Sequence, residues 1–438
     1  MAPTRCAWHE GSPSLTAASV DAIHLDPVIF SGRFHPAASR ADLSSVRAKT
    51  SRLLRGQGVS LLIAGLLHLT RPLRLSAADH FEIKHELYRE DAGRVEVSTS
   101  TFLIEKALGS SLVAKGQMVY DTISGATPTG GPPPTGSDRV PLASIEDIRR
   151  AGTLELAQRL GRHTLAPQVA YSIENDYESY GLSLSDSFEF NNRNTVVTLG
   201  LSRIVDRVLN ANTPYVGQQA IEHKYTTDVM LGMTQLLGPK TILTANATIG
   251  TSDGYLTDPY KGIHFDAADP FFGPGYLFGE NRPRHRTRQV VYASLKQFFT
   301  KADASAELSY RLHRDSFGIC AHTIGLTWHQ KLGKYLSLQP SLRYHDQTGA
   351  EYYFASVPGS LGFPLFPGPS LPKFYSADYR LSSLHSWTYG IKATLKAHDR
   401  VWFEIGYKRY VMEGDDPSTA GSQYPQANVV TGGLLVWF

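Results

Sequence analysis

Cysteine is almost absent from this chain of 438 residues, which contains only Cys6 and Cys320. Two cysteines so far apart in the sequence indicate neither a disulfide framework nor a cysteine-based zinc site. We expect Cys320 to be a small apolar packing residue and not a nucleophile. Enzyme motifs are missing too: no Gly-rich phosphate loop lies between a strand and a helix, no HExxH occurs, and no GxSxG forms an elbow between a strand and a helix, because GTSDG at 250–254 leads into a loop. We therefore expect no enzyme, no catalytic residues and no cofactor.

Long hydrophobic runs are also scarce, and the mean hydropathy is −0.22. The apolar run at 59–69 is far shorter than the roughly 20 residues that a membrane-spanning helix needs. A basic stretch from Val46 precedes this run, and small residues, including Ser76 and Ala78, follow it. This order predicts a signal peptide at 46–78, cleaved before Asp79. Residues 1–45 show no periodicity, and we interpret them as an upstream extension from a start assigned too early.

An excess of charge of one sign is missing from the part that follows the signal. Residues 1–78 hold nine basic and four acidic groups, a sum of +5, whereas the whole chain carries +3. About −2 is left for 79–438. The basic isoelectric point therefore belongs to the leader, and we expect no nucleic-acid partner.

Alternation of apolar and polar residues is the dominant pattern after Asp79. Segments 302–313, 335–345 and 387–396 each place apolar side chains on one face and polar or charged ones on the other. A soluble sandwich strand also alternates, so the argument rests on repetition. Sixteen such strands are predicted, at 80–90, 93–106, 110–122, 151–161, 163–175, 180–191, 193–206, 224–237, 240–252, 286–299, 302–315, 317–331, 334–347, 384–397, 400–413 and 427–438.

The connections between these strands alternate in length. Long ones are expected at 123–150, 207–223, 253–285, 348–383 and 414–426, each separated from the next by short turns. Bacterial outer-membrane barrels have short periplasmic turns and long outer loops. The fold predicted is all-β, a transmembrane antiparallel up-and-down β-barrel of about 16 strands at 79–438, surrounded by outer-membrane lipid.

The end of the chain supports this prediction. Its last strand ends on Phe438, and a C-terminal aromatic residue on such a strand resembles the signal that the barrel assembly machinery reads. The 22 tyrosines suit the interface between lipid and water, because a tyrosine is apolar along its body and polar at its tip.

Several polar phrases resemble a family of bacterial outer-membrane proteins catalogued as domain of unknown function 3570. They are DTISGATPTGGPP at Asp121, DYESYGLSLS at Asp176, TDPYKG at Thr257, RPRHRTRQ at Arg282, SADYRLS at Ser376 and YKRY at Tyr407. The resemblance implies a barrel and an export route. The genes of such families can neighbour those of thioredoxin-like proteins and flavin-attachment enzymes, which hints at redox company, although no residue of this sequence shows it.

Two sets of residues are candidates for function. The polar strand faces predict a lumen lined by eight basic and six acidic groups, and so a weakly selective field. This set comprises Lys115, Asp121, Glu174, Asp228, Arg288, Lys296, Asp303, Glu307, Arg311, Arg343, Lys392, Lys396, Glu404 and Lys408. The family phrases predict a rim that either binds an anionic or sugar-like ligand or pins the loops to the wall. Beside Asp121 and Arg288 it comprises Asp176, Glu178, Asp258, Tyr260, Lys261, Arg284, His285, Arg286, Asp378, Tyr379 and Arg380.

Two further groups of residues carry weaker signals. His264, Asp266 and Asp269 have a spacing that a metal could use, but they lie in a loop rich in Gly and Pro, so we expect no metal. Ser309 and His322 could meet on adjacent strands, as in outer-membrane hydrolases, but no local signature singles them out.

The leading functional hypothesis is a channel for a small polar solute in the outer membrane of a Gram-negative bacterium. The alternative is a non-conducting barrel that receives a periplasmic partner, and a third hypothesis is a soluble periplasmic β-protein. Sixteen strands can enclose an aqueous channel. Whether the channel is open depends on the loops at 123–150 and 348–383, which could fold inward.

Overall fold

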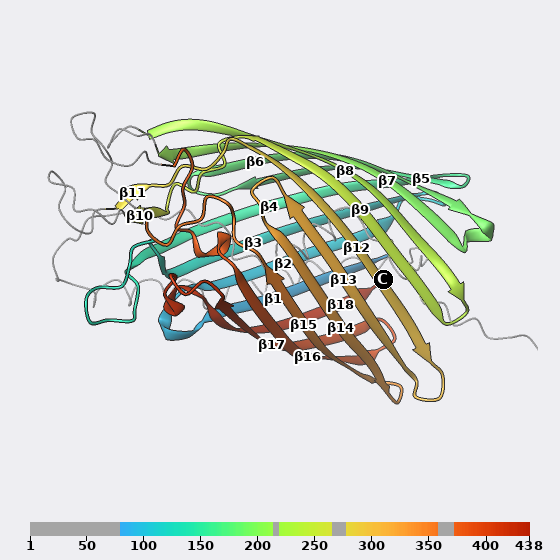
Figure 1. Cartoon of the computed structure of the whole chain (residues 1–438). Helices are drawn as coiled ribbons and strands as arrows, with labels where there is room; N and C mark the ends of the chain where they lie inside the picture. Colours follow the sequence, from blue (N-terminus) through green and yellow to red (C-terminus); the bar gives the residue numbers. More distant parts are fainter. Residues whose placement is uncertain (1–78, 213–218, 265–276, 358–371) are drawn as a thin grey trace, which may run out of the picture.

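The protein forms a closed antiparallel barrel of sixteen strands in a computed structural model. The structure describes residues 79–438 with the exception of 213–218, 265–276 and 358–371. The barrel strands are β1 (His80–Glu90), β2 (Glu96–Ala107), β3 (Leu112–Pro128), β4 (Leu142–Leu160), β5 (His163–Ile173), β6 (Tyr177–Phe190), β7 (Thr195–Asn212), β8 (Gln219–Gly238), β9 (Thr241–Gly254), β12 (His285–Phe299), β13 (Ala304–Asp315), β14 (Cys320–Leu332), β15 (Leu336–Gln347), β16 (Leu384–His398), β17 (Val401–Gly414) and β18 (Gln426–Trp437). Figure 1 shows them running obliquely between two ends.

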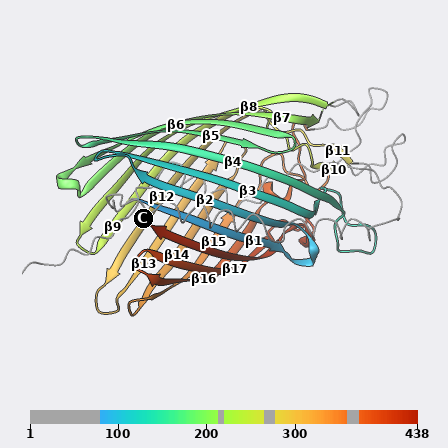
Figure 2. The ribbon, with the colours of Figure 1, turned by 180° about the vertical axis from the view of Figure 1, so that it is seen from behind.

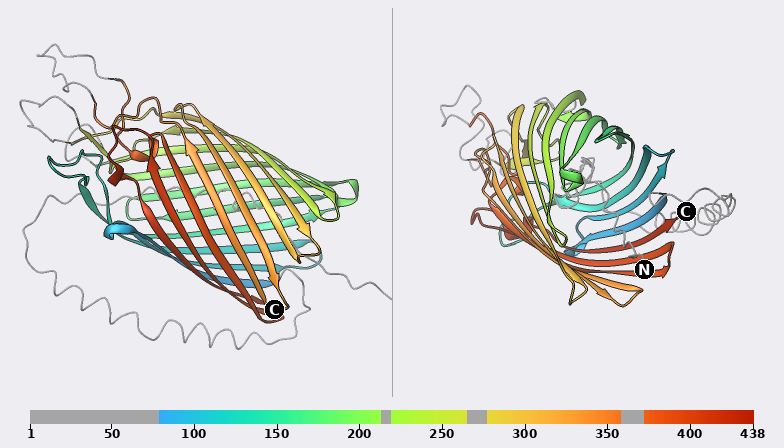
Figure 3. Two further views of the ribbon diagram at one scale, coloured as in Figure 1. Left: turned by 60° about the horizontal axis from the view of Figure 1, so that its bottom comes forward. Right: turned by 90° about the vertical axis from the view of Figure 1, so that its right-hand side faces the viewer.

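The predicted architecture is confirmed. Each strand pairs with its neighbours in the chain, and β1 pairs with β18 from His80↔Trp437 onward, which closes the ring. The Phe438 amide donates to the Asp79 carbonyl at 3.0 Å, so the terminal residue lies at this seam. The same strands are seen from behind in Figure 2, and Figure 3 shows them as a ring around an interior. Short turns gather at one end, hereafter the short-turn end, and long connections at the other, the long-loop end.

The outer surface of the barrel is apolar because every second side chain points outward. In β6 the outward residues Tyr180, Leu182 and Leu184 are exposed, and Leu199 and Leu201 are their counterparts in β7. A water-soluble protein rarely exposes a continuous apolar surface of this kind. A closed barrel with an apolar exterior instead satisfies the two demands of a bilayer, since it leaves no unpaired strand edge and places apolar groups against lipid.

Outward aromatic residues form a band at each end of this apolar surface. Towards the long-loop end, the rings of Tyr171 and Tyr180 lie 5.0 Å apart, and Trp387 lies 4.6 Å from Tyr344. Towards the short-turn end, Phe299 stacks on Trp328 at 5.6 Å. Such bands mark the two membrane interfaces of transmembrane barrels.

Several strands are longer than the sequence predicted, and most of the added length lies at the long-loop end. β3 and β4 pair as far as Pro128↔Leu142, and β7 and β8 as far as Asn212↔Gln219, so the loops expected at 123–150 and 207–223 are shorter. These extensions carry polar outward residues such as Ser144 and Glu146, because strand ends beyond the bilayer no longer face lipid. The alternation of apolar and polar residues, from which the strands were predicted, therefore ends before the strands themselves end.

The remaining elements are short. β10 (Gly262–His264) and β11 (Leu277–Gly279) form a two-stranded sheet within the β9–β12 connection, where the sequence predicted only loop. Single 3-10 turns occur at η1 (Asp91–Gly93), η2 (Asn191–Arg193), η3 (Tyr379–Leu381) and η4 (Gly421–Gln423). Among the described residues, no helix is long and apolar enough to cross a membrane.

Candidate functional site at the long-loop mouth

The interior wall carries the polar side chains that alternate with the outward apolar ones. With one exception, the residues predicted to line the lumen lie on inward faces of the strands, or directly after β5 in the case of Glu174. The exception is Asp303, which belongs to the turn between β12 and β13 at the short-turn end. Its side chain is 56% exposed and lies 3.6 Å from Lys331. The strand was predicted from residue 302 but begins at Ala304, so Asp303 precedes it and does not belong to the inward face.

Inward charges pair with one another along the wall. The Arg288 and Asp228 side chains are 3.1 Å apart, as are those of Lys392 and Glu404. Lys392 and Glu404 stand on the paired strands β16 and β17, where opposite charges stabilise the sheet, whereas Arg288 and Asp228 reach each other from β12 and β8 across the intervening β9. The pairs leave the lumen with groups of both signs close together.

The two halves of the lumen differ in exposure to solvent. Nearer the short-turn end, the side chains of Lys84 and Lys392 are 42% and 41% exposed. Nearer the long-loop end, inward residues such as Asp206 in β7, Ser386 in β16 and Ala427 in β18 are buried. The barrel is therefore accessible in one half and filled by its loops in the other.

A network of buried charges joins two of these loops. Arg380, in the β15–β16 connection, donates from Nε to both carboxylate oxygens of Asp378, at 2.8 and 2.9 Å. Its Nη2 lies 2.6 Å from Asp258 Oδ2, in the β9–β12 connection. Asp258 and Asp378 expose 3% and 1% of their side chains. Burial alone would raise the pKa of Asp378, but the guanidinium groups of Arg380 and Arg282 outweigh it and hold the pKa below its usual range.

Glu280 and Arg282 complete the network from β9–β12. Arg282 Nε lies 2.5 Å from Glu280 Oε1, and Arg282 Nη2 donates to Asp378 Oδ2 at 2.8 Å. Glu280 also accepts from the Asp258 amide at 2.6 Å. Burial raises the pKa of Glu280 to about 7 although Arg282 opposes the shift. A lone charge in this position would be costly, so the paired groups hold the two loops in one arrangement.

Lys261 extends the network across the mouth to β3. Its ammonium donates to the Pro128 carbonyl at 2.6 Å, and the Gly262 amide donates to the Thr129 carbonyl at 2.9 Å. β3 and β9 are six strands apart in a ring of sixteen, which places them near opposite sides. Burial lowers the pKa of Lys261. Loops from distant parts of the wall thus meet over the lumen.

Other loops join from the remaining side of the ring. Arg94, after the β1–β2 turn, donates to the carbonyls of Ser422 and Gln423 in the β17–β18 connection, at 2.9 and 3.1 Å. The Tyr353 hydroxyl lies 2.6 Å from Thr419 Oγ1. The set of contacts that involve Asp258, Lys261, Glu280, Arg282, Asp378 and Arg380 is called here the mouth network.

The structure brings part of the predicted rim together. Asp258, Tyr260, Lys261, Asp378, Tyr379 and Arg380 all lie in or against the mouth network and are mostly buried, so they tie loops together and do not form an open ring. The sequence missed Glu280 and Arg282 as members. Their signal was the pair of opposite charges two residues apart in GENRPR, within and beside a family phrase.

The other rim candidates lie elsewhere. Glu178 pairs with Arg207, and His285 pairs with Asp253 at 2.6 Å on an exposed part of the wall. Arg284 binds Glu222 at 2.8 Å. Arg286 binds Asp315 of the neighbouring strand, with Nε 2.8 Å from Oδ2. These residues are paired locally along the strands, so they do not converge.

Asp176 belongs to a separate acidic group. Carboxylate oxygens of Asp147, Glu174 and Asp176 lie within 4.8 Å of one another, in an arrangement whose oxygen ligands could suit a hard cation. Burial raises the pKa of Glu174 to about 7, and Arg149 opposes this shift. Of the metal candidates considered from the sequence, Asp266 and Asp269 lie outside the described residues.

Ser309 and His322 do not meet. Ser309 lies on the inward face of β13 and contacts the Gly325 carbonyl at 3.4 Å, whereas His322 points outward from β14, with Nδ1 2.7 Å from the Tyr310 hydroxyl. The barrel wall separates the two side chains.

The fold and the polar interior define a transmembrane β-barrel of the outer-membrane type. Residues 62–433 match the family described as "Protein of unknown function (DUF3570)", and the chain belongs to this family. The predicted leader at 1–78 lies outside the described residues. No curated protein matches the chain.

Solved structures align with the chain at low identity. One described as "Bacterial polysaccharide outer membrane secretin" has a TM-score of 0.44 and 9% identity, over 82% of this chain and 98% of that one. The siderophore receptor PirA from Pseudomonas aeruginosa has a TM-score of 0.39 and 11% identity, over 83% and 63%. PirA from Acinetobacter baumannii has a TM-score of 0.41 and 11% identity, over 83% and 60%. The chain thus spans somewhat less than two thirds of these receptors.

Proposed function

We propose that this protein is an outer-membrane channel for a small polar solute, with its long-loop end facing outward and its short turns facing the periplasm. The observation that supports this proposal is the difference in solvent exposure between the two halves of the lumen. One half presents solvated charges of both signs, and the other is narrowed by the mouth network. A solute that enters must pass the loops first and then a polar conduit.

The charge pattern supports a small solute without strong charge preference. Pairs such as Arg288 with Asp228 and Lys392 with Glu404 keep positive and negative groups side by side, so neither sign dominates the field. The buried loops limit the size of the solute. To cross the mouth, a solute must pass between loops that are joined by contacts such as the ion pair between Arg380 and Asp258.

A second candidate is a non-conducting barrel that receives a periplasmic partner at its short-turn end, a redox protein being one such partner, with no enzymatic activity of its own. The observation that favours it is the crossing of the mouth by loops from β3, β9–β12 and β15–β16, which in a permanently closed state would block flow. The charged side chains of the lumen would then only stabilise the barrel wall.

Planar-bilayer recordings of the purified barrel separate the two. Reproducible conductance steps in salt, absent from mock-purified samples, support the channel. Electrically silent insertion, verified by protease protection, overturns the channel, and specific recovery of a periplasmic protein by the immobilised barrel would then support the second candidate.

A further inference from the structure

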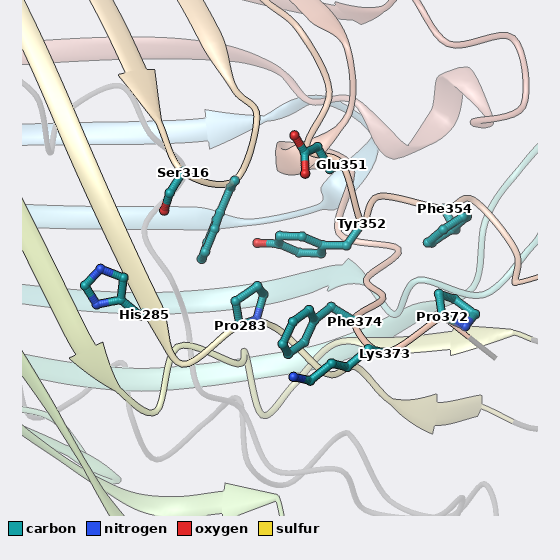
Figure 4. Close-up of a pocket in the computed structure, with 10 residues that line it drawn as sticks. Pro283, His285, Ser316, Glu351, Tyr352, Phe354, Pro372, Lys373 and Phe374 are labelled. Carbon is teal, nitrogen blue, oxygen red and sulfur yellow. The ribbon is translucent and has the colours of Figure 1, made fainter. Parts of the chain in front are cut away.

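A cavity of about 460 Å³ lies beside the mouth network, within the size range of small-molecule sites. It lies between the β13–β14 turn, the end of the β9–β12 connection and two stretches of the β15–β16 connection. Its lining comprises Pro283, His285, Ser316, Phe317, Glu351, Tyr352, Phe354, Pro372, Lys373 and Phe374. Figure 4 shows these side chains around the cavity.

Aromatic side chains make up much of the walls of this cavity. Phe317 packs edge-to-face against Tyr352 with ring centroids 5.0 Å apart, and the Arg286 guanidinium covers Phe317 at 4.8 Å. The Glu351 amide donates to the Phe317 carbonyl at 2.8 Å, which ties the two connections together. Phe374 packs against the same cluster but stays half-buried. Aromatic rings fixed in this way offer flat faces to a ligand.

Polar groups of both kinds surround these faces. Lys373 is an exposed donor and Glu351 an exposed acceptor on the lining. Their opposite charges favour a neutral ligand over an anion or a cation. In Figure 4 the Tyr352 hydroxyl points towards the side of the cavity where Ser316, His285 and Pro283 lie.

Tyr352 adds a group that needs a partner. The residue is 6% exposed, and its hydroxyl has no hydrogen-bond partner among the described residues. A buried hydroxyl without a partner costs about 1–3 kcal/mol relative to a satisfied one. Most buried hydroxyls in proteins have a hydrogen-bond partner. The unpaired Tyr352 hydroxyl therefore points to a ligand hydroxyl as its partner, which reaches it when the neighbouring half-buried rings adjust.

We propose that this cavity binds a neutral saccharide ring of one or two units. A pyranose matches the lining because one face carries C–H groups that pack on Phe374 and Phe354, while its hydroxyls both donate and accept. Glu351 accepts from them, Lys373 donates to them, and the Tyr352 hydroxyl pairs with one. The proposal does not depend on conductance, because binding here requires no passage through the barrel.

The test uses the full barrel in a detergent that contains no sugar, since glycoside detergents would compete. The probes are methyl α-D-glucopyranoside, methyl α-D-galactopyranoside and methyl α-D-mannopyranoside. Their binding is detected by saturation-transfer NMR and quantified by titration. We expect transfer from the protein to at least one probe. Phe374→Ala should weaken binding about tenfold, through loss of a stacking face. Tyr352→Phe should weaken it about fivefold, through loss of one hydrogen bond.

The matched control is Tyr353→Phe. This neighbour carries a half-buried hydroxyl, but that hydroxyl is already paired with Thr419, and Tyr353 is not among the residues that line the cavity. Binding unchanged in the control and weakened in Tyr352→Phe supports the site, provided that the heat-modifiable migration of both variants shows folded barrels. Absence of transfer to all three probes overturns the proposal. The saccharide is the wrong ligand class if phenol binds more strongly than all three saccharides and its affinity is the same for the wild type and Tyr352→Phe.

Discussion

Replacement of Arg380 by alanine should loosen the mouth while the barrel stays folded. Arg380 contributes hydrogen bonds to Asp378 and an ion pair to Asp258, both of which are almost completely buried. Breaking a buried ion pair typically costs about 3–5 kcal/mol. We expect a value near the lower end, about 3 kcal/mol, because Asp378 keeps Arg282 at 2.8 Å and because water can enter beside Asp258.

This loss can be measured at the backbone of the loop. The Leu381 amide donates to the Asp378 carbonyl at 2.8 Å, and the Ala350 amide donates to the Leu381 carbonyl at 2.7 Å. A change of about 1.4 kcal/mol alters an equilibrium tenfold, so hydrogen exchange at these amides should accelerate roughly a hundredfold. Arg380→Lys should be intermediate, since it keeps the charge and loses the fork that binds two carboxylates.

Arg89→Ala is the matched control. Arg89 pairs with Glu96 at 2.7 Å, but their side chains are 61% and 40% exposed, so the pair contributes at most about 1 kcal/mol. Exchange at Leu381 should be unchanged in this control. Unchanged exchange at Leu381 in Arg380→Ala, with strand amides as an internal reference, would refute the view that the mouth network holds the loops.

Three further outcomes are expected. Because burial raises the pKa of Glu280 to about 7 in the closed mouth, closure is favoured at low pH and this contribution is lost as the pH rises through that value. Conductance should therefore rise between about pH 4.5 and about pH 7 and level off above it, and Glu280→Gln should flatten the profile. Gly130→Ala should release the loop at Gly262, because Gly130 has φ +93° and an added Cβ would lie 2.0 Å from the Gly262 carbonyl oxygen. We expect faster hydrogen exchange at the Gly262 amide and an unchanged melting temperature of the barrel. Glu404→Lys removes an acceptor that Lys392 contacts, and the reversal potential in a salt gradient should shift towards anion preference.

The barrel could be predicted from the sequence because lipid imposes a strict pattern on the wall. Tyr389 and Ile391 alternate with Thr388 and Lys392, and such alternation fixes the strand, its register and the inward face. The prediction lost accuracy where lipid ends. Leu142–Leu160 begins nine residues before the predicted strand, since Glu146 faces outward above the membrane.

The mouth network could be predicted only in part. The phrases at Asp258 and Asp378 indicated that these residues belong together, but periodicity says nothing about loops, so the sequence could not place Glu280 against Arg282 or carry Lys261 to Pro128. The contact between Lys261 and Pro128 joins residues 133 apart in the chain. Such pairing depends on how the closed ring brings its loops together.

The most direct test of a narrowed polar channel is the size limit of liposome swelling. Liposomes with the wild-type barrel should swell in glycerol and slowly or not at all in sucrose, while Arg380→Ala should admit sucrose and change the glycerol rate little. Arg89→Ala should behave as wild type. Swelling in neither solute for both wild type and Arg380→Ala, with insertion verified, would contradict the account.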